Sequence, residues 1–444
     1  MRLPALAAAL TAAALVAATA FAEPQGFARL EGHGGPVQSV ARSPDGAVAL
    51  TTSFDYAAGL WNIDEARLIR WLDGHEAAVT TGAFAPDGSR ALTGSDDFTL
   101  ILWDVATGEA LARFEGHTAK VQHVAVAADG RMAASASWDG RIGLWDLDAG
   151  ASLGFLTGHR GGVNAVAFSG DGATLWSAGH DGTVRRWDVA TRAFEAVEAE
   201  HGFGVNLLTL NEDAGWLAYG ALDGGVRVLD LATGAQIADI TAGRRPALGL
   251  ALSPDRTLIA VGDGEGYINV ASTEDWQSVR DFRAVPRGPI WALDFDGTGR
   301  RLLAGGLDSH VDIWPIDDAR SAQEADLLRP FQLSEGMSNG ERQFVRKCSI
   351  CHSLTPDGGR RAGPSLHGLF GRPAGTLASY DYSEALERAT IVWTEETVDK
   401  LFEIGPDYYT PGSKMPMQRI AKPQDRADLV AWLRAATATQ ESTP

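Results

Sequence analysis

Cysteine is scarce in this sequence. Its 444 residues include two cysteines, three positions apart, which excludes a disulfide scaffold and a multi-cysteine metal cluster. Basic residues are in the minority, with 38 lysines and arginines against 57 aspartates and glutamates, a formal net charge of -19. An acidic surface repels phosphate backbones, so we expect no nucleic acid partner. After the first 22 residues no apolar run reaches the length of a membrane-spanning helix.

Residues 1–22 have the pattern of a secretory signal peptide. One arginine precedes an alanine-rich apolar run that ends in the small-x-small triplet Ala20-Phe21-Ala22. A retained membrane anchor is the alternative, but the alanine richness, Pro4 and the cleavage-like end favour the signal. We expect cleavage after Ala22 and an exported, soluble mature protein with no membrane span.

A 42-residue repeat runs through the first three quarters of the chain. Its markers are a histidine, usually after glycine, then an aspartate 22 residues later and a tryptophan six residues after that. The histidines are His33, His75, His117, His159 and His201; the aspartates are Asp55, Asp97, Asp139, Asp181 and Asp223; the tryptophans are Trp61, Trp103, Trp145 and Trp187. Between these markers, alternating apolar runs and Ser-Pro-Asp-Gly turns indicate short β-strands.

These markers resemble the WD40 repeat family over roughly Phe27 to Ile316, in seven units. The resemblance implies an all-β seven-bladed propeller, each blade a four-stranded antiparallel sheet. In that family the blades contain a hydrogen-bonded set of His, Ser or Thr, Asp and Trp. Carried over by position, four units are complete: His33-Thr51-Asp55-Trp61, His75-Thr93-Asp97-Trp103, His117-Ser135-Asp139-Trp145 and His159-Ser177-Asp181-Trp187. The fifth to seventh units depart from the pattern, so we expect them to rely more on apolar packing.

The seventh unit has no obvious fourth strand after Trp314. Residues Phe27 to Glu31 are extended in character and belong to no unit, so they are predicted to supply that strand and close the ring. A closed ring leaves few unpaired strand edges.

Four apolar residues directly precede the recurrent aspartate position: Phe54, Trp138, Leu222 and Leu307. In WD40 propellers this position tends to face the central opening. There these side chains would form an exposed patch for a partner protein. Ordinary packing within loops is the alternative, and the sequence leaves both open.

The 42-residue spacing ends before residues 318–334, which mix charges with alanine and are predicted to be a short linker. The predicted organisation is therefore a signal peptide over 1–22, a propeller over 23–317, the linker, and a second domain over 335–440. The linker is too short for large separation, so the two folded parts are expected to stay close.

Cys348-Ser349-Ile350-Cys351-His352 has the C-x-x-C-H spacing of c-type haem attachment. Two thiols on one helical turn can add to the two vinyl groups on one edge of a porphyrin, and the adjacent histidine then lies beneath the iron. A thioredoxin-like redox pair would need a βαβ context, and a zinc site would need further cysteines. Haem attachment is therefore favoured.

From Gly336 to about Thr439 the chain resembles class I cytochrome c, which implies a small all-α domain with one covalent haem c. Gly340 and the segment Arg426 to Leu433 resemble the family's packed terminal helices. The resemblance implies that the Pro364 carbonyl accepts the N–H of His352, and that Tyr382 and Trp393 hydrogen-bond a haem propionate. His367, in the same loop as Pro364, is expected to be structural.

The resemblance also implies a methionine as the second axial ligand. Met415, in Pro411-Gly412-Ser413-Lys414-Met415-Pro416, corresponds to the family's ligand loop, with Met417 as a rival and a plain core methionine as a further alternative. His352 and Met415 are thus the expected metal ligands. A His/Met pair leaves no open coordination position, which suits electron transfer. We assign no catalytic residue and expect a carrier, not an enzyme.

The expected function is single-electron transfer in the periplasm, with redox partner proteins and a protein docked on the propeller. An oxidoreductase whose propeller binds a second cofactor or substrate is the alternative. A second haem would need His123, His180 or His310 as ligand. A strongly positive docking face is not expected, because residues 335–440 contain thirteen basic and thirteen acidic residues.

Overall fold

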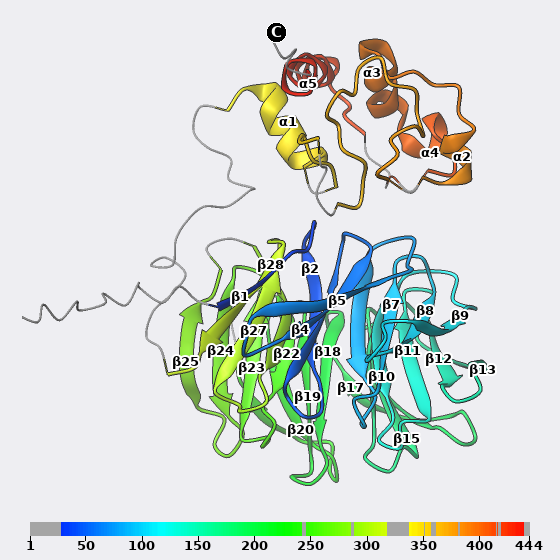
Figure 1. Cartoon of the computed structure of the whole chain (residues 1–444). Coiled ribbons are helices and arrows are strands. Elements are labelled where there is room, and N and C mark those ends of the chain that lie inside the picture. Colours follow the sequence, from blue (N-terminus) through cyan, green and yellow to red (C-terminus); the bar gives the residue numbers. More distant parts are fainter. Residues whose placement is uncertain are drawn as a thin grey trace, which may run out of the picture.

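The computed structural model describes residues 28–241, 246–285, 288–317, 337–349, 351–356, 361–380, 382–413, 415 and 419–438. It shows a ring of β-sheets and a smaller helical domain that lies over one face of the ring (Figure 1). The predicted signal peptide, the predicted linker and Met417 lie outside the described residues.

Seven four-stranded antiparallel sheets form a β-propeller. The first three blades contain β2 (Val37–Arg42), β3 (Val48–Ser53), β4 (Ala57–Asn62), β5 (Arg67–Asp73), β6 (Val79–Phe84), β7 (Arg90–Ser95), β8 (Leu100–Asp104), β9 (Ala110–Phe114), β10 (Val121–Val126), β11 (Met132–Ser137), β12 (Arg141–Asp146) and β13 (Ala151–Thr157). The next two contain β14 (Val163–Phe168), β15 (Thr174–Gly179), β16 (Thr183–Asp188), β17 (Ala193–Glu200), β18 (Val205–Asn211), β19 (Trp216–Ala221), β20 (Val226–Asp230) and β21 (Gln236–Asp239). The last two contain β22 (Ala247–Leu252), β23 (Leu258–Asp263), β24 (Tyr267–Ser272), β25 (Ser278–Arg283), β26 (Ile290–Phe295), β27 (Arg301–Gly306), β28 (His310–Pro315) and β1 (Ala28–Glu31).

The ring is closed by the strand that precedes the first repeat. β1 pairs antiparallel with β28, with Leu30 opposite Val311, and the side chain of Leu30 is fully buried. This confirms the predicted closure over residues 28–31. The seam between the first and last blades is reinforced by Arg42, which donates a 2.5 Å hydrogen bond to Asp294.

The predicted hydrogen-bonded sets are present in the first four blades. In the first, the Trp61 indole donates to the Thr51 hydroxyl at 2.7 Å, and the same hydroxyl lies 2.7 Å from His33 Nε2. His33 Nδ1 lies 2.9 Å from the Asp55 carboxylate, which can only accept, so Nδ1 carries the proton. The next three blades repeat these contacts at 2.7–3.0 Å. The histidine, hydroxyl, aspartate and tryptophan of each of these four sets are therefore hydrogen-bonded to one another.

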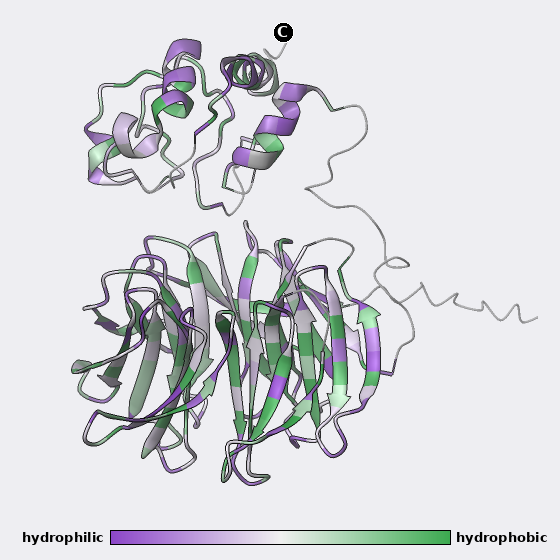
Figure 2. Ribbon diagram, turned by 180° about the vertical axis from the view of Figure 1, so that it is seen from behind, coloured by the Kyte–Doolittle hydropathy of each residue, from purple (hydrophilic) through white to green (hydrophobic). Residues whose placement is uncertain are grey.

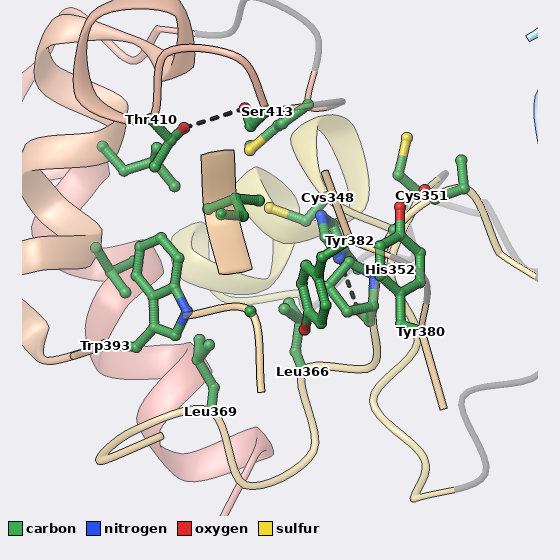
Figure 3. A pocket seen from close by; sticks show the side chains of 18 of the residues that line it. Cys348, Cys351, His352, Leu366, Leu369, Tyr380, Tyr382, Trp393, Thr410 and Ser413 are labelled. Carbon is green, nitrogen blue, oxygen red and sulfur yellow. Dashed lines mark hydrogen bonds between the residues drawn. The ribbon is translucent and has the colours of Figure 1, made fainter. Parts of the chain in front are cut away.

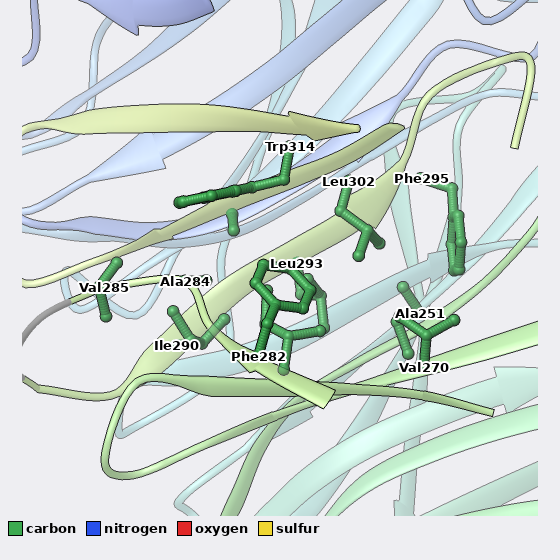
Figure 4. Packing of buried hydrophobic residues seen from close by; sticks show 13 residues of the cluster. Ala251, Val270, Phe282, Ala284, Val285, Ile290, Leu293, Phe295, Leu302 and Trp314 are labelled. Atoms are coloured by element: carbon green, nitrogen blue, oxygen red, sulfur yellow. The ribbon is translucent and has the colours of Figure 1, made fainter. Parts of the chain in front are cut away.

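The later blades depart from this pattern, as predicted. In the fifth, His201 keeps its 3.0 Å contact with Asp223, but Leu229 replaces the tryptophan. Between the sixth and seventh blades an apolar cluster fills the interior (Figure 4): Phe282, Ile290, Leu293, Phe295, Leu302 and Trp314 are among its residues. Burial of apolar side chains and the dispersion contacts between them stabilise these blades in place of the hydrogen-bonded set.

The apolar residues before the blade aspartates are largely exposed. Trp138 is 46% exposed, Leu222 42% and Leu307 37%, whereas Phe54 is half-buried. Because these residues occupy the same turn in the first, third, fifth and seventh blades, they lie on one face of the ring. Elsewhere apolar residues concentrate within the strands (Figure 2). In the described part of the chain, no helix is both long and apolar enough to span a membrane.

The C-terminal domain contains α1 (Asn339–Lys347), α2 (Glu384–Glu387), α3 (Glu395–Ile404), α4 (Pro406–Tyr409) and α5 (Pro423–Ala436). α1 packs on α5, and the rings of Phe344 and Trp432 lie 4.8 Å apart. A Cβ at Gly340 would lie 2.1 Å from the Asp428 carbonyl oxygen, so only glycine allows the two helices to approach this closely. The predicted helix contact at Gly340 is confirmed.

We predict that Leu30→Ala weakens ring closure. The buried leucine lies on the closing strand, so its truncation is expected to lower the free energy of unfolding of the propeller by about 2–5 kcal/mol. Urea unfolding followed by tryptophan fluorescence measures the change. Glu31→Ala, at an exposed position of the same strand, is the control; equal stability of both variants would contradict closure by β1.

We predict that acid destabilises the blades through their aspartates. Burial raises the pKa of Asp181, but hydrogen bonds from Arg160, Thr183 and His159 outweigh it and lower the pKa to about 2. The unfolded value is about 3.9, so this stabilisation is present above about pH 4 and is lost as the pH falls toward 2. Asp181→Asn should be less stable at pH 7 and lose less on acidification in thermal unfolding. The exposed Asp213→Asn should keep the wild-type profile.

Candidate functional site

A cavity lies in the C-terminal domain between α1, α3, α5 and the loops that connect them (Figure 3). It encloses about 1060 Å³ of empty space, part of it open to solvent, which is at the upper end of the size of organic ligand sites. Its apolar wall includes Leu366, Leu369, Val398, Leu401, Phe402 and Leu433. Such a wall excludes water from whatever the cavity holds.

All the residues predicted to bind the cofactor line this one cavity: Cys348, Cys351, His352, Pro364, Tyr382, Trp393 and Met415. They come from the end of α1, from the loops before and after α2, and from the loop after α4. Residues up to 67 positions apart in the chain thus meet at one site.

His352 is held in one tautomer. Its Nδ1 lies 2.8 Å from the Pro364 carbonyl oxygen, which can only accept, so Nδ1 carries the proton and Nε2 carries the lone pair. Burial lowers the pKa of His352, which keeps the imidazole neutral. A Cβ at Gly363 would lie 2.4 Å from His352 Cε1, so glycine is required beside the ring. A neutral imidazole that is held in one orientation is suited to bind a metal ion through its free nitrogen.

The two cysteines are free thiols at the end of α1, Cys348 buried and Cys351 half-buried. The Cys351 N–H donates to the Cys348 carbonyl at 3.1 Å, and this turn places both residues on the cavity wall (Figure 3). Burial raises the pKa of Cys348 to about 12 and also raises that of Cys351, so both thiols are uncharged. Within the described residues no group of three or more His, Cys, Asp or Glu could hold a metal ion.

Met415 lines the cavity and packs against its apolar wall. His367 is not part of the described cavity lining. Its backbone N–H donates to the Ser365 hydroxyl at 3.1 Å and its backbone carbonyl accepts from Arg372 at 3.0 Å. The structural role of the His367 side chain remains a prediction.

Arg372 is a site residue to which the sequence analysis assigned no role. Its guanidinium donates to the carbonyls of His367 and Ser365, at 3.0 and 2.7 Å, and it lines the cavity near Tyr382. It offers a fixed positive charge to a carboxylate. Tyr380, which donates to the Ala362 carbonyl at 2.6 Å, also lines the cavity, as does Tyr56 from the propeller.

Comparison with known proteins assigns both parts of the chain. A family model described as cytochrome c matches residues 337–437. Cytochrome c of Nigella damascena is 42% identical over 101 residues, 23% of this chain and 90% of the relative. Cytochrome c of Chlamydomonas reinhardtii is 43% identical over 102 residues, 23% and 90% of the two chains, and that of Gossypium barbadense 44% over 99 residues, 22% and 88%. The chain belongs to the cytochrome c family. 

A model described as WD domain, G-beta repeat matches residues 25–62, 66–104, 108–146, 150–188 and 276–315. These five segments contain the blade tryptophans Trp61, Trp103, Trp145, Trp187 and Trp314. The predicted WD40 propeller joined to a C-terminal cytochrome c domain is therefore confirmed.

The cytochrome c domain accordingly binds haem c covalently, and one haem fits the single domain. The residues present fit this group: two uncharged thiols at the cavity wall, an oriented imidazole beside the glycine that makes room for it, and an arginine for a carboxylate. Membership of this family indicates electron transfer by haem, and the WD40 repeats indicate protein interaction.

We predict that Gly363→Ala displaces His352. The added Cβ would lie 2.4 Å from the ring, so the imidazole must move and its hydrogen bond to Pro364 weakens. Overpacking of this kind costs about 1–3 kcal/mol. Thermal unfolding and the visible spectrum of the loaded protein measure the effect. Gly202→Ala, which adds a Cβ into open space on the propeller, is the control; an unchanged Gly363→Ala spectrum and stability would contradict the prediction.

Proposed function

We propose that this protein is an exported, periplasmic electron carrier. Its cytochrome c domain holds one haem with His352 and Met415 as axial ligands, and its propeller docks a partner protein. The observation that supports this most strongly is the convergence of the two thiols, the oriented imidazole and the thioether on one cavity.

The bound haem would supply the one-electron chemistry, and residues of the chain would orient its ligands and determine its reduction potential. Pro364 fixes the tautomer of His352, so that Nε2 presents its lone pair to the iron. Met415 would supply a thioether ligand besides the imidazole of His352, a pair that would favour the reduced metal and raise the potential. These two protein ligands would leave no position for a substrate, so we assign no catalytic residue.

Three polar residues of the cavity would hold the carboxylates of the haem. Tyr382, Trp393 and Arg372 line the cavity together, and the arginine is fixed by two backbone carbonyls. A fixed positive charge lowers the cost of placing a carboxylate in an apolar surrounding.

The proposed location rests on two features of the sequence. Residues 1–22 have the pattern of a secretory signal, and c-type haem attachment in bacteria takes place outside the cytoplasmic membrane.

The proposed docking role rests on the exposed apolar residues Trp138, Leu222 and Leu307 on one face of the ring.

The test is to produce the full chain with the cytochrome c maturation machinery and to measure its mass, iron content and spectrum. We expect residues 1–22 to be absent, one haem added in mass, one iron per chain and a low-spin spectrum insensitive to carbon monoxide. Met415→Ala should bind carbon monoxide, whereas the control Met417→Ala should not. An unmodified mass would refute the proposal, and more than one iron per chain would favour an oxidoreductase with a second cofactor.

A further inference from the structure

The cytochrome c domain touches the propeller through Arg361. Its guanidinium donates a hydrogen bond to the Gly34 carbonyl in the first blade. The same nitrogen lies 3.5 Å from the carbonyl of Ser349, which stands between the two haem cysteines. Arg361 therefore links the haem-attachment loop directly to the propeller. Figure 1 shows the C-terminal domain over the face of the ring on which this contact is made.

The Gly34 carbonyl belongs to a rigid part of the blade. The N–H of Gly34 donates to the Asp55 carboxylate at 2.8 Å, and Asp55 is the buried aspartate of the first blade's hydrogen-bonded set. The acceptor offered to Arg361 is thus positioned by the blade interior, and the Asp55 carboxylate is an electrostatic neighbour of the guanidinium. Both features favour binding of a cation at this place.

Tyr56, the residue after Asp55, reaches the haem cavity. Among the described residues that line the cavity, Tyr56 is the one from the propeller, and it shares that lining with Cys351 and Tyr380. Its ring is half-buried, and burial raises the pKa of its phenol well above the ordinary value. The first blade thus contributes a side chain to the cavity wall on the side of Cys351.

The backbone at Tyr56 is strained for a tyrosine. Its φ is 71°, in the left-handed region that favours glycine. At the matching turn four other blades have glycines with φ of 76–92°: Gly140, Gly182, Gly224 and Gly266. The second blade has Phe98 with φ 72°, 42% exposed. Glycine would satisfy this turn without strain, and of the two strained aromatic residues Tyr56 is the one that lines the cavity.

We propose that the first blade is the docking site of this chain's own cytochrome c domain, and that Tyr56 covers the haem edge beside Cys351 while Arg361 clamps the domain in place. This inference rests on the haem of the proposed function and adds a partner for one part of the propeller face. Trp138, Leu222 and Leu307 on the same face remain exposed, so a protein docked on them would lie on the side where the haem is.

Tyr56→Gly tests the cover, because glycine is the residue that four blades already have at this turn. With the cover removed, ascorbate should reduce the haem severalfold faster, and the reduction potential should fall because solvent reaches the haem edge. Phe98→Gly makes the matching change in the second blade, away from the cavity, and should leave both values as in the wild type. Equal rates and potentials for the two variants would overturn the proposed role of Tyr56.

Arg361→Ala combined with Tyr56→Gly tests the docking itself, by small-angle scattering of the full haem-loaded chain. The radius of gyration should increase as the cytochrome domain leaves the propeller. Arg388→Ala, which removes an exposed arginine elsewhere on the domain, is the control and should leave the radius unchanged. An unchanged radius for the double variant would overturn the docking proposal, whereas a wild-type chain without covalent haem would overturn the proposed function instead.

Discussion

A buried imidazole needs a partner for each ring nitrogen, and this requirement organises both domains. In the first four blades the protein satisfies both nitrogens: His33 has Asp55 at one and Thr51 at the other, each within hydrogen-bond distance. Those histidines are structural, because neither ring nitrogen is left to bind a metal ion or a substrate. In the cytochrome c domain Pro364 satisfies Nδ1 of His352, and Nε2 is the nitrogen left for a metal ligand bond. The second partner therefore separates the two roles: a structural histidine in the blades and, in the proposed function, a metal ligand in the cytochrome c domain.

Ring closure makes the propeller a rigid support for the smaller domain. β1 completes the sheet of β28, and the first blade follows directly from that strand. Gly34 lies in the turn before β2 and Tyr56 in the turn after β3, and Asp55 holds the first of these turns by accepting the Gly34 N–H. A contact made from such a turn has a fixed geometry, which small sites need in order to hold a group reproducibly.

The contact between the domains is small, and the covalent connection explains why a small contact suffices. Residues 318–334 join the two parts, so the cytochrome c domain is always present near the propeller at a high effective concentration. Two free proteins would need a larger interface to reach the same occupancy. The acidic balance of the chain outside residues 335–440 adds a long-range attraction for basic groups such as Arg361.

The sequence by itself determined the elements that depend on local spacing. The 42-residue period predicts the blades, and the aspartate and tryptophan offsets predict the hydrogen-bonded sets, because a repeated unit needs the same satisfied groups each time. The spacing of Cys348, Cys351 and His352 predicts covalent haem attachment, and residues 28–31 were identified as the closing strand by having no unit of their own. The resemblance to class I cytochrome c placed Met415 at the same site, where the structure has it lining the cavity.

Only the tertiary structure decided which residues from distant parts of the chain share the cavity. Arg372 was visible in the haem loop, but its two carbonyl partners and its position beside Tyr382 depend on how that loop folds. Arg361 and Gly34 are 327 positions apart in the chain. Tyr56 belongs to a blade turn whose sequence does not indicate a contact with the other domain. The repeat period and the spacing within a motif predict contacts between residues of the same folded unit. A contact between two independently folded units leaves no such pattern, because neither fold requires it.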